Sequence, residues 1–279
     1  MNGENGVSFE PKFDDACRNT KLRMRHQLTT RLKLYSCIAL LIALCGAGSV
    51  RAQQTAVTIS GRVSEESTGQ GIDSVAVVAL GNQTGTRVAI TDAQGNYRLP
   101  FGANTNIKLR AYKTGFIFNP ASVELISPGG QPINGARTFD FTGTRLPFPI
   151  LIFALPPILL TEDESLNALA LDAVLHTRDP FPLVNDHYFG ADSRTRVKLF
   201  LVDLDLYSGE TLSIISVQAQ DEQRRAYVLP VEDLRKVPNF PWLSQLTIRL
   251  PGELAGVTDI TLSVSARGQA SNVTRLRLR

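Results

Sequence analysis

Apolar and polar positions alternate along most of the chain from Val57 to Arg145, with the period of two that half-buried β-strands show. In the turn Asp92–Gly95, Asp92 can accept a hydrogen bond from the backbone two residues on, and Gly95 can take a positive φ. We therefore expect a hairpin of two strands, 86–91 and 96–100. The full set of predicted strands is 57–63, 72–80, 86–91, 96–100, 107–113, 116–120, 123–126 and 138–141. This number and spacing of short strands is typical of a β-sandwich.

A second series of strands follows, punctuated by proline and glycine. Thr161 is a candidate N-cap before an acidic first turn, which predicts a short helical turn over 162–169. The predicted strands are 168–177, 196–206, 211–220, 226–231, 246–250, 259–266 and 271–279. Their number favours an Ig-like sandwich over 166–279. The predicted fold is therefore all-β, with two tandem antiparallel β-sandwich domains, 57–145 and 166–279, after an N-terminal signal peptide.

The segment 146–165 between the two series is apolar and rich in proline. Its prolines prevent a spanning helix or a central strand, and they are Pro147, Pro149, Pro156 and Pro157. The favoured interpretation is a stiff linker whose apolar side chains pack against the domains. The alternative is an exposed docking patch for a partner or a membrane surface.

The first 52 residues have the order of a secretory signal peptide, with an unusually long n-region. A basic stretch precedes a fifteen-residue apolar run, 34–48, and Val50-Arg51-Ala52 gives a small-x-small pattern. We expect cleavage between Ala52 and Gln53. An uncleaved anchor is the alternative, although the run is shorter than the ~20 apolar residues that span a bilayer. The protein is thus expected to be secreted or on the cell surface, with the periplasm and the outer surface both open.

The cysteine content and the net charge of the chain both change when the predicted signal peptide, residues 1–52, is removed. The three cysteines are Cys17, Cys37 and Cys45, so the remainder has no disulfide, thiolate zinc site or cysteine nucleophile. The formal net charge of +3 becomes −1, because the leader carries eight Lys/Arg and four Asp/Glu. Nucleic acid is therefore not an expected partner, and membrane contact is expected only through an uncleaved leader.

Several motifs in the first series occur in a recognisable order. They are Ile59-Ser60-Gly61-Arg62-Val63, Gly71-Ile72-x-x-Val75-x-Val77, Thr91-Asp92-x-x-Gly95-x-Tyr97 and Phe139-Asp140-Phe141-Thr142-Gly143-Thr144. Together they resemble the carboxypeptidase regulatory-like domain, a transthyretin-like sandwich that is grouped with carbohydrate-binding-like folds. The resemblance covers 57–145 and implies an accessory domain without peptidase chemistry.

The second series resembles a C-terminal β-domain of secreted, multi-domain proteins from acidobacterial-type soil bacteria. The matching residues include Thr177-Arg178-Asp179-Pro180-Phe181 and Val237-Pro238-Asn239-Phe240-x-Trp242-Leu243. The end of the chain is also similar to the IPT/TIG immunoglobulin-like pattern. This resemblance implies location and architecture, and it transfers no activity.

Four residues are candidates for ligand binding: Asp92, Asn96, Tyr97 and Tyr112. Asp92 and Asn96 could bind calcium, although hydrogen bonding within the turn is favoured. Tyr97 and Tyr112, with Phe116 and Phe118, could form a platform for sugar rings, although packing in the core is favoured for most of these rings.

Other polar residues do not form a chemical signature. His176 and His187 lie near several aspartates, but their spacing matches no zinc motif. Asp203 and Asp205 share a strand face and could pair on calcium or face water. We expect no catalytic residues, no metal site and no cofactor.

These observations favour a non-catalytic structural or adhesive module that binds envelope or extracellular protein or polysaccharide. The alternative is a carbohydrate-binding module that acts through the first domain. The sequence does not predict the oligomeric state.

Overall fold

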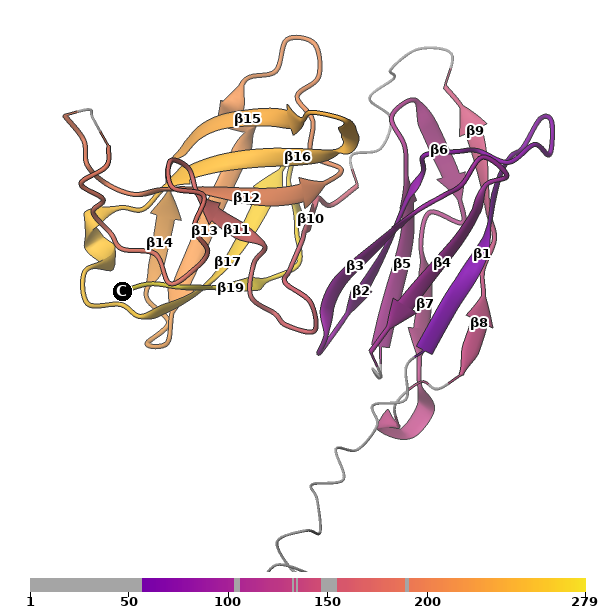
Figure 1. Cartoon of the computed structure of the whole chain (residues 1–279), viewed down its shortest axis with the longest axis horizontal. Coiled ribbons are helices and arrows are strands. Elements are labelled where there is room, and N and C mark those ends of the chain that lie inside the picture. Colours follow the sequence, from indigo (N-terminus) through magenta and orange to yellow (C-terminus); the bar gives the residue numbers. More distant parts are fainter. Residues whose placement is uncertain (1–56, 103–105, 132, 134, 147–154, 189–190) are drawn as a thin grey trace, which may run out of the picture. The chain divides into compact units, whose positions relative to one another are not determined.

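The computed structural model describes residues 57–279, except for 103–105, 132, 134, 147–154 and 189–190. The predicted leader and its cleavage site at Ala52 and Gln53 lie outside these residues. Gln54–Arg279 forms one compact unit, and its described part is all-β, with four sheets that build two sandwiches (Figure 1). No helix in the described ranges has the length and apolar character needed to cross a membrane.

The first sandwich is built from nine strands in two sheets. One sheet has the order β4-β1-β9-β6, with β8 also paired to β1, and the other has the order β3-β2-β5-β7. The strands are β1 (Val57–Glu65), β2 (Ala76–Gly81), β3 (Gly85–Ile90), β4 (Asn96–Phe101), β5 (Asn106–Tyr112), β6 (Phe116–Asn119), β7 (Val123–Ile126), β8 (Ala136–Thr138) and β9 (Phe141–Arg145). Alternate residues of these strands face inward, as the period of two predicts. The core includes Ile59, Val63, Val77, Leu99, Phe101, Leu109 and Phe141.

The long strand β1 departs from the predicted antiparallel arrangement. It pairs with β4 antiparallel, but with β8 and β9 parallel (Figure 1). β8 pairs with residues 58–60 of β1, and β9 pairs with residues 63–65 of β1. Two hydrogen bonds connect β1 to the segment between β8 and β9. Phe139 N donates to Ser60 O at 2.9 Å, and Arg62 N donates to a carboxylate oxygen of Asp140 at 2.7 Å. The backbone of β1 therefore stays paired while its partner changes.

The predicted hairpin around Asp92–Gly95 is wrong, because its two strands belong to different sheets. β3 pairs with β2, and β4 pairs with β1. Thr91 anchors the turn on one side: its hydroxyl oxygen accepts from Val75 N at 2.9 Å and donates to Ile72 O at 2.7 Å. On the other side, Val63 N donates to Gly95 O at 2.8 Å. The turn is therefore a connection between the two sheets.

Replacement of Thr91 with Val should lower the free energy of unfolding by about 2 kcal/mol, because a buried N–H and a buried carbonyl lose their partner. Urea unfolding of the two proteins measures the effect. The matched control is Thr68→Val, an exposed threonine whose hydroxyl bonds to Glu65 and to Gln70 N on the surface, with an expected change below about 0.5 kcal/mol. Equal effects of the two substitutions would show that the Thr91 hydroxyl does not anchor the turn.

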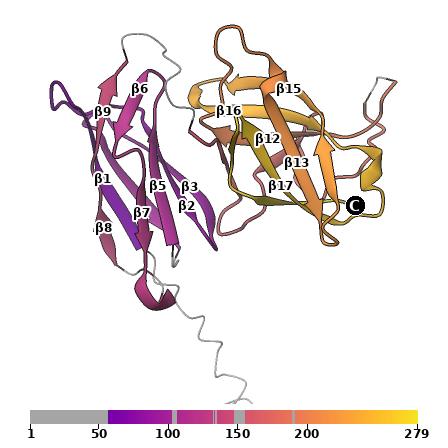
Figure 2. The same cartoon turned by 180° about the vertical axis from the view of Figure 1, so that it is seen from behind.

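The second sandwich is antiparallel in all its named strands. One sheet has the order β10-β12-β16-β15, with β11 on β12, and the other has the order β14-β13-β17-β18, with β19 on β17 (Figure 2). The strands are β10 (Ile158–Leu159), β11 (Ala170–Asp172), β12 (Arg196–Val202), β13 (Ile215–Asp221), β14 (Ala226–Leu229), β15 (Val231–Val237), β16 (Phe240–Arg249), β17 (Asp259–Ala266), β18 (Gln269–Ala270) and β19 (Thr274–Arg277). The core between the sheets includes Phe181, Val197, Leu199, Leu201, Val217, Ile248, Leu262 and Leu276.

Strand β15 is the element that sequence reasoning missed. It lies at the edge of its sheet, and most of its residues are charged or only partly buried. Strands at the edge of a sheet often carry charged side chains, which prevent pairing with other chains. The sequence of β15 therefore lacks the alternation of apolar and polar residues that marks a strand, and it resembles the sequence of a loop. Asn239, with a φ of 67°, turns the chain from β15 into β16, which begins six residues before the predicted 246.

The C-terminal part of the predicted linker 146–165 belongs to the second sandwich. Ile158 and Leu159 form β10, which pairs with β12, and Leu160 is also buried. This packing agrees with the favoured interpretation for 156–160, in which the apolar side chains cover a domain. Residues 147–154 lie outside the described part of the chain.

Candidate functional site

The two sandwiches meet on the outer face of the sheet β3-β2-β5-β7. Val78 of β2 packs there in one buried cluster with Ile158, Leu160 and Val202 of the second sandwich. Partly buried side chains surround this cluster: Val88, Tyr112, Leu169, Phe200, Trp242 and Leu243. We call this contact the joint. Its apolar part consists of side chains from both sandwiches that pack against one another.

Polar groups complete the joint beside the apolar cluster. Arg110 of β5 forms an ion pair with Asp203, and it also donates to Pro156 O at 2.6 Å. Tyr112, two residues along the same strand face, donates its hydroxyl to Asp205 at 2.8 Å. Lys236 of β15 pairs with the other carboxylate oxygen of Asp205. The ion pair of Arg110 with Asp203 and the hydrogen bond of Tyr112 with Asp205 therefore connect the two sandwiches, while Lys236 neutralises Asp205 from within the second sandwich.

Burial sets the protonation behaviour of this cluster. The Arg110 side chain is only 8% exposed, and that of Asp203 is 19% exposed. Burial raises the pKa of Asp203 to about 6, while the Arg110 cation opposes the rise. Burial and the neighbouring Asp205 carboxylate also raise the pKa of Tyr112 above its usual range. The carboxylate of Asp203 is thus paired with Arg110, and that of Asp205 with Lys236 and Tyr112, so both acids take part in the contacts of the joint.

A second polar contact of the joint corrects the prediction for Thr161. Thr86 N donates to the Thr161 hydroxyl oxygen at 2.8 Å, and Thr161 N donates to the Thr86 hydroxyl oxygen at 2.7 Å. The Thr161 side chain is therefore occupied by β3 and does not cap a helix. The segment 162–169 is a turn, closed by a bridge between Thr161 and Ala168, rather than the predicted helical turn.

The structure places Asp92 and Asn96 in the exposed turn between the sheets. The Asp92 carboxylate accepts hydrogen bonds from Asn96 N at 2.8 Å and Gln94 N at 3.0 Å. These bonds to the backbone, that to Asn96 first, lower the pKa of Asp92. The favoured interpretation, hydrogen bonding within the turn, describes this carboxylate.

The two predicted tyrosines do not join this turn at a common surface. Tyr97 is 4% exposed, and its hydroxyl donates to Phe139 O at 2.7 Å, so its ring packs in the core. Tyr112 lies in the joint, where its hydroxyl is held by Asp205. The prediction of a sugar platform that includes Tyr97 is therefore wrong, and packing is the role of that ring.

The remaining histidines and acids are held by local contacts. The His187 ring lies 2.9 Å from the Asn185 side-chain oxygen, and the His176 ring lies 3.1 Å from the Lys198 ammonium. One Asp172 carboxylate oxygen accepts from the backbone of residues 174 and 175, and the other accepts from Asn185. Among the described residues, no group of three or more His, Cys, Asp or Glu side chains is arranged to hold a metal ion.

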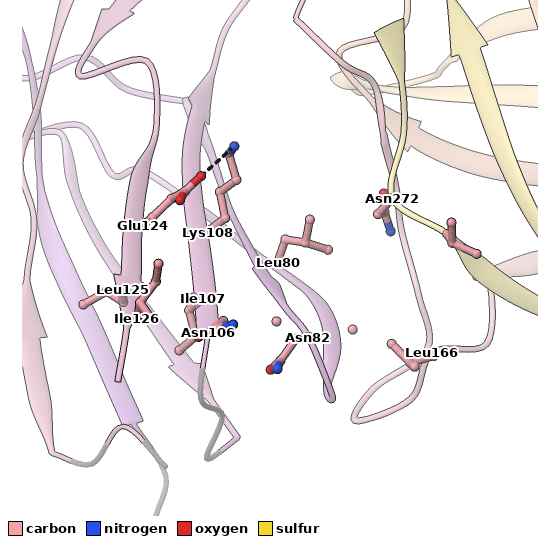
Figure 3. Close-up of a pocket in the computed structure, with 13 residues that line it drawn as sticks. Leu80, Asn82, Asn106, Ile107, Lys108, Glu124, Leu125, Ile126, Leu166 and Asn272 are labelled. Carbon is pink, nitrogen blue, oxygen red and sulfur yellow. Dashed lines mark ion pairs between the residues drawn. The ribbon is translucent and has the colours of Figure 1, made fainter. Parts of the chain in front are cut away.

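Two hollows border the joint. The first, of about 400 Å³, lies between β2, β5 and β7 on one side and Leu166, Asn272 and Val273 on the other (Figure 3). We call it the groove. The second, of about 330 Å³, is lined by the aromatic rings of Tyr112, Phe116 and Tyr207 together with Asp203 and Asp205. We call it the aromatic pocket. Sequence reasoning did not predict either hollow, because each combines residues from both sandwiches.

Comparison with known proteins assigns no family. No family model matches the chain, and no curated protein matches it. The resemblance of 57–145 to the carboxypeptidase regulatory-like domain therefore stays a prediction.

Solved structures with tandem domains match only weakly. The crystal structure of BcpA, the major pilin subunit of Bacillus cereus, is 8% identical with a TM-score of 0.26, over 80% of this chain and 69% of that chain. The Bacillus anthracis TIE protein is 5% identical with a TM-score of 0.27, over 81% of this chain and 49% of that chain, so the match spans about half of that protein. The crystal structure of bovine butyrophilin is 6% identical with a TM-score of 0.22, over 80% of this chain and 99% of that chain. Values this low assign neither a family nor a function.

Proposed function

We propose that the protein is an exported, non-catalytic structural or adhesive module that binds a polypeptide of the cell envelope or the extracellular space. The observation that carries this proposal is the joint. Domains in one chain move relative to one another unless their interface is large or apolar. Here an apolar cluster and a buried ion pair fix the two sandwiches, and a surface module that presents a partner-binding face at a set angle requires this property.

The charges of the joint serve the same role. Arg110 neutralises Asp203, and Lys236 neutralises Asp205, so the acids nearest to a hollow are engaged in holding the sandwiches together. Acids poised for catalysis are tuned toward a reacting group, whereas Asp203 is paired with a cation across the joint and Asp205 with a cation of its own sandwich.

The test is retention of the purified protein on cell envelope, on envelope treated with protease, and on a panel of insoluble polysaccharides. Capture by intact envelope that protease treatment abolishes is the expected result. Retention on protease-treated envelope and on a purified glycan would instead support the alternative below. Failure on every surface would overturn both functions.

The alternative function, carbohydrate binding, is favoured by one observation, the aromatic pocket. Tyr207 and Phe116 are half-buried rings beside carboxylates, the combination that stacks on and hydrogen-bonds to sugars. In this alternative, Phe116→Ala should weaken retention on the bound glycan by about tenfold, because ring stacking contributes on the order of 1 kcal/mol or more. Val228→Ala, an exposed residue of β14 that does not line the aromatic pocket, is the control, and an equal loss in both would contradict stacking.

A further inference from the structure

The groove lies on the part of the sheet β3-β2-β5-β7 that the joint leaves uncovered. Val78 of β2 is buried in the joint, and Leu80, on the same face two residues further, lines the groove. Lys108 and Glu124 lie on the same face, on the neighbouring strands β5 and β7 (Figure 3). The groove therefore continues the surface that already binds the second sandwich.

Three exposed apolar side chains surround the groove. Ile126 of β7 is 66% exposed, Val273 is 60% exposed and Leu166 is 45% exposed. They come from three separate segments of the chain, yet they border one hollow (Figure 3). Single exposed apolar residues are ordinary, whereas a group around a hollow marks a binding site.

The strand β7 forms the edge of its sheet beside this hollow. It pairs with β5 on one side, from Asn106↔Ile126 to Leu109↔Val123, and the described residues place no strand on the other side. An uncovered edge offers backbone N–H and C=O groups to an incoming strand. Its one charged side chain, Glu124, is paired with Lys108 at 3.0 Å, so it does not protect the edge by repulsion.

The chemistry of the lining selects the kind of ligand. None of the lining residues is aromatic, so the groove lacks the ring on which a sugar would stack. The lining is largely apolar, and the ion pair of Lys108 with Glu124 is neutral overall. A strongly charged ligand would therefore gain little binding free energy from electrostatic attraction. We propose that β7 and the groove bind an extended, uncharged polypeptide segment of the partner, which adds a strand beside β7 and places apolar side chains against Ile126 and Leu166. This inference rests on the proposed adhesive function and names its binding surface.

The test uses an immobilised heptapeptide of alternating Thr and Val. A heptapeptide of alternating Thr and Gly, which has the same length but lacks the apolar side chains, is the control. We expect the protein to bind the first peptide, and Ile126→Lys and Leu166→Lys each to weaken binding by about tenfold or more. The matched control is Val228→Lys: Val228 is 69% exposed in β14, which is also a four-residue strand at the edge of a sheet. It should bind within about twofold of the unmodified protein.

Hydrogen exchange separates strand addition from simple occupation of the hollow. Amide exchange of residues 123–126 should slow when the peptide binds. Unchanged exchange there, an equal loss with Val228→Lys, or a bound polysaccharide released by Ile126→Lys would overturn the inference. If Ile126→Lys still binds envelope protein as well as the unmodified chain, this surface is wrong and the adhesive function stands. If the unmodified chain binds no envelope protein, the adhesive function itself fails.

Discussion

Replacement of Arg110 with Met is expected to lower the free energy of unfolding by about 3–5 kcal/mol, because it leaves the buried carboxylate of Asp203 without its cation. Methionine keeps most of the packing volume of the side chain, so the loss reports the charge together with the hydrogen bond to Pro156 O. Trp242 is the only tryptophan and packs at the joint, so its fluorescence follows this region during urea unfolding. We expect the Trp242 signal of the variant to change at lower urea concentration than that of the unmodified protein.

Two further variants isolate the ion pair. Arg98→Met removes an exposed arginine of β4, and its expected effect is below about 0.5 kcal/mol. The double variant Arg110→Met with Asp203→Asn removes both charges and should recover a large part of the loss. Asn suits this position because residue 203 has a φ of 64°, a conformation that Asn and Asp tolerate better than other side chains. If Arg110→Met behaves like Arg98→Met, the ion pair does not hold the joint.

The second large effect is a dependence of stability on pH that comes from Asp203. Its pKa is about 6 in the folded chain, against an ordinary value of 3.8. Between these values the folded chain binds a proton that the unfolded chain does not, so the contribution of this group to stability is largest below its unfolded pKa and is lost as pH rises through 6. The full loss is on the order of 3 kcal/mol.

Comparison with Asp203→Asn isolates this contribution. The pKa values of Asp192, Asp221 and Glu210 are lowered, so these acids stabilise the fold as pH rises and oppose the effect of Asp203. The difference in free energy of unfolding between the unmodified protein and Asp203→Asn should therefore fall between about pH 4 and pH 6 and level off above about pH 7. A difference that is constant, or that grows with pH, would contradict the assignment.

The sequence predicted the strands well and their partners less well. The period of two located β7 and β17 to the residue, since alternation marks a strand and its buried face. The same alternation does not say which strand lies alongside, and for this reason the 86–91 and 96–100 strands were wrongly paired. Their placement depends on the contacts of Thr91 with Ile72 and Val75 and of Gly95 with Val63, which are distant in the sequence.

The candidate site was predicted in part. The side-chain pattern of the turn identified the hydrogen bonds of Asp92 correctly, because they are local. Asp203, Asp205 and Tyr112 were recognised as candidate site residues. The ion pair of Asp203 with Arg110 could not be predicted, because the two residues are 93 positions apart and no sequence motif connects them. One signal was present: Arg110 lies on the polar face of its alternating strand, and the neighbouring strand β2 is apolar on both faces, so a charge on that face required a partner.

The mixed pairing of β1 has a consequence for the order in which the first sandwich folds. Of the three strands that pair with β1, β4 is the nearest in the sequence, whereas β8 and β9 are the last two strands of the first sandwich. The first sheet therefore stays incomplete until residue 145 is in place, and its long-range pairings delay folding. Folding of the first sandwich is therefore expected to be slower than that of a sheet built from local hairpins.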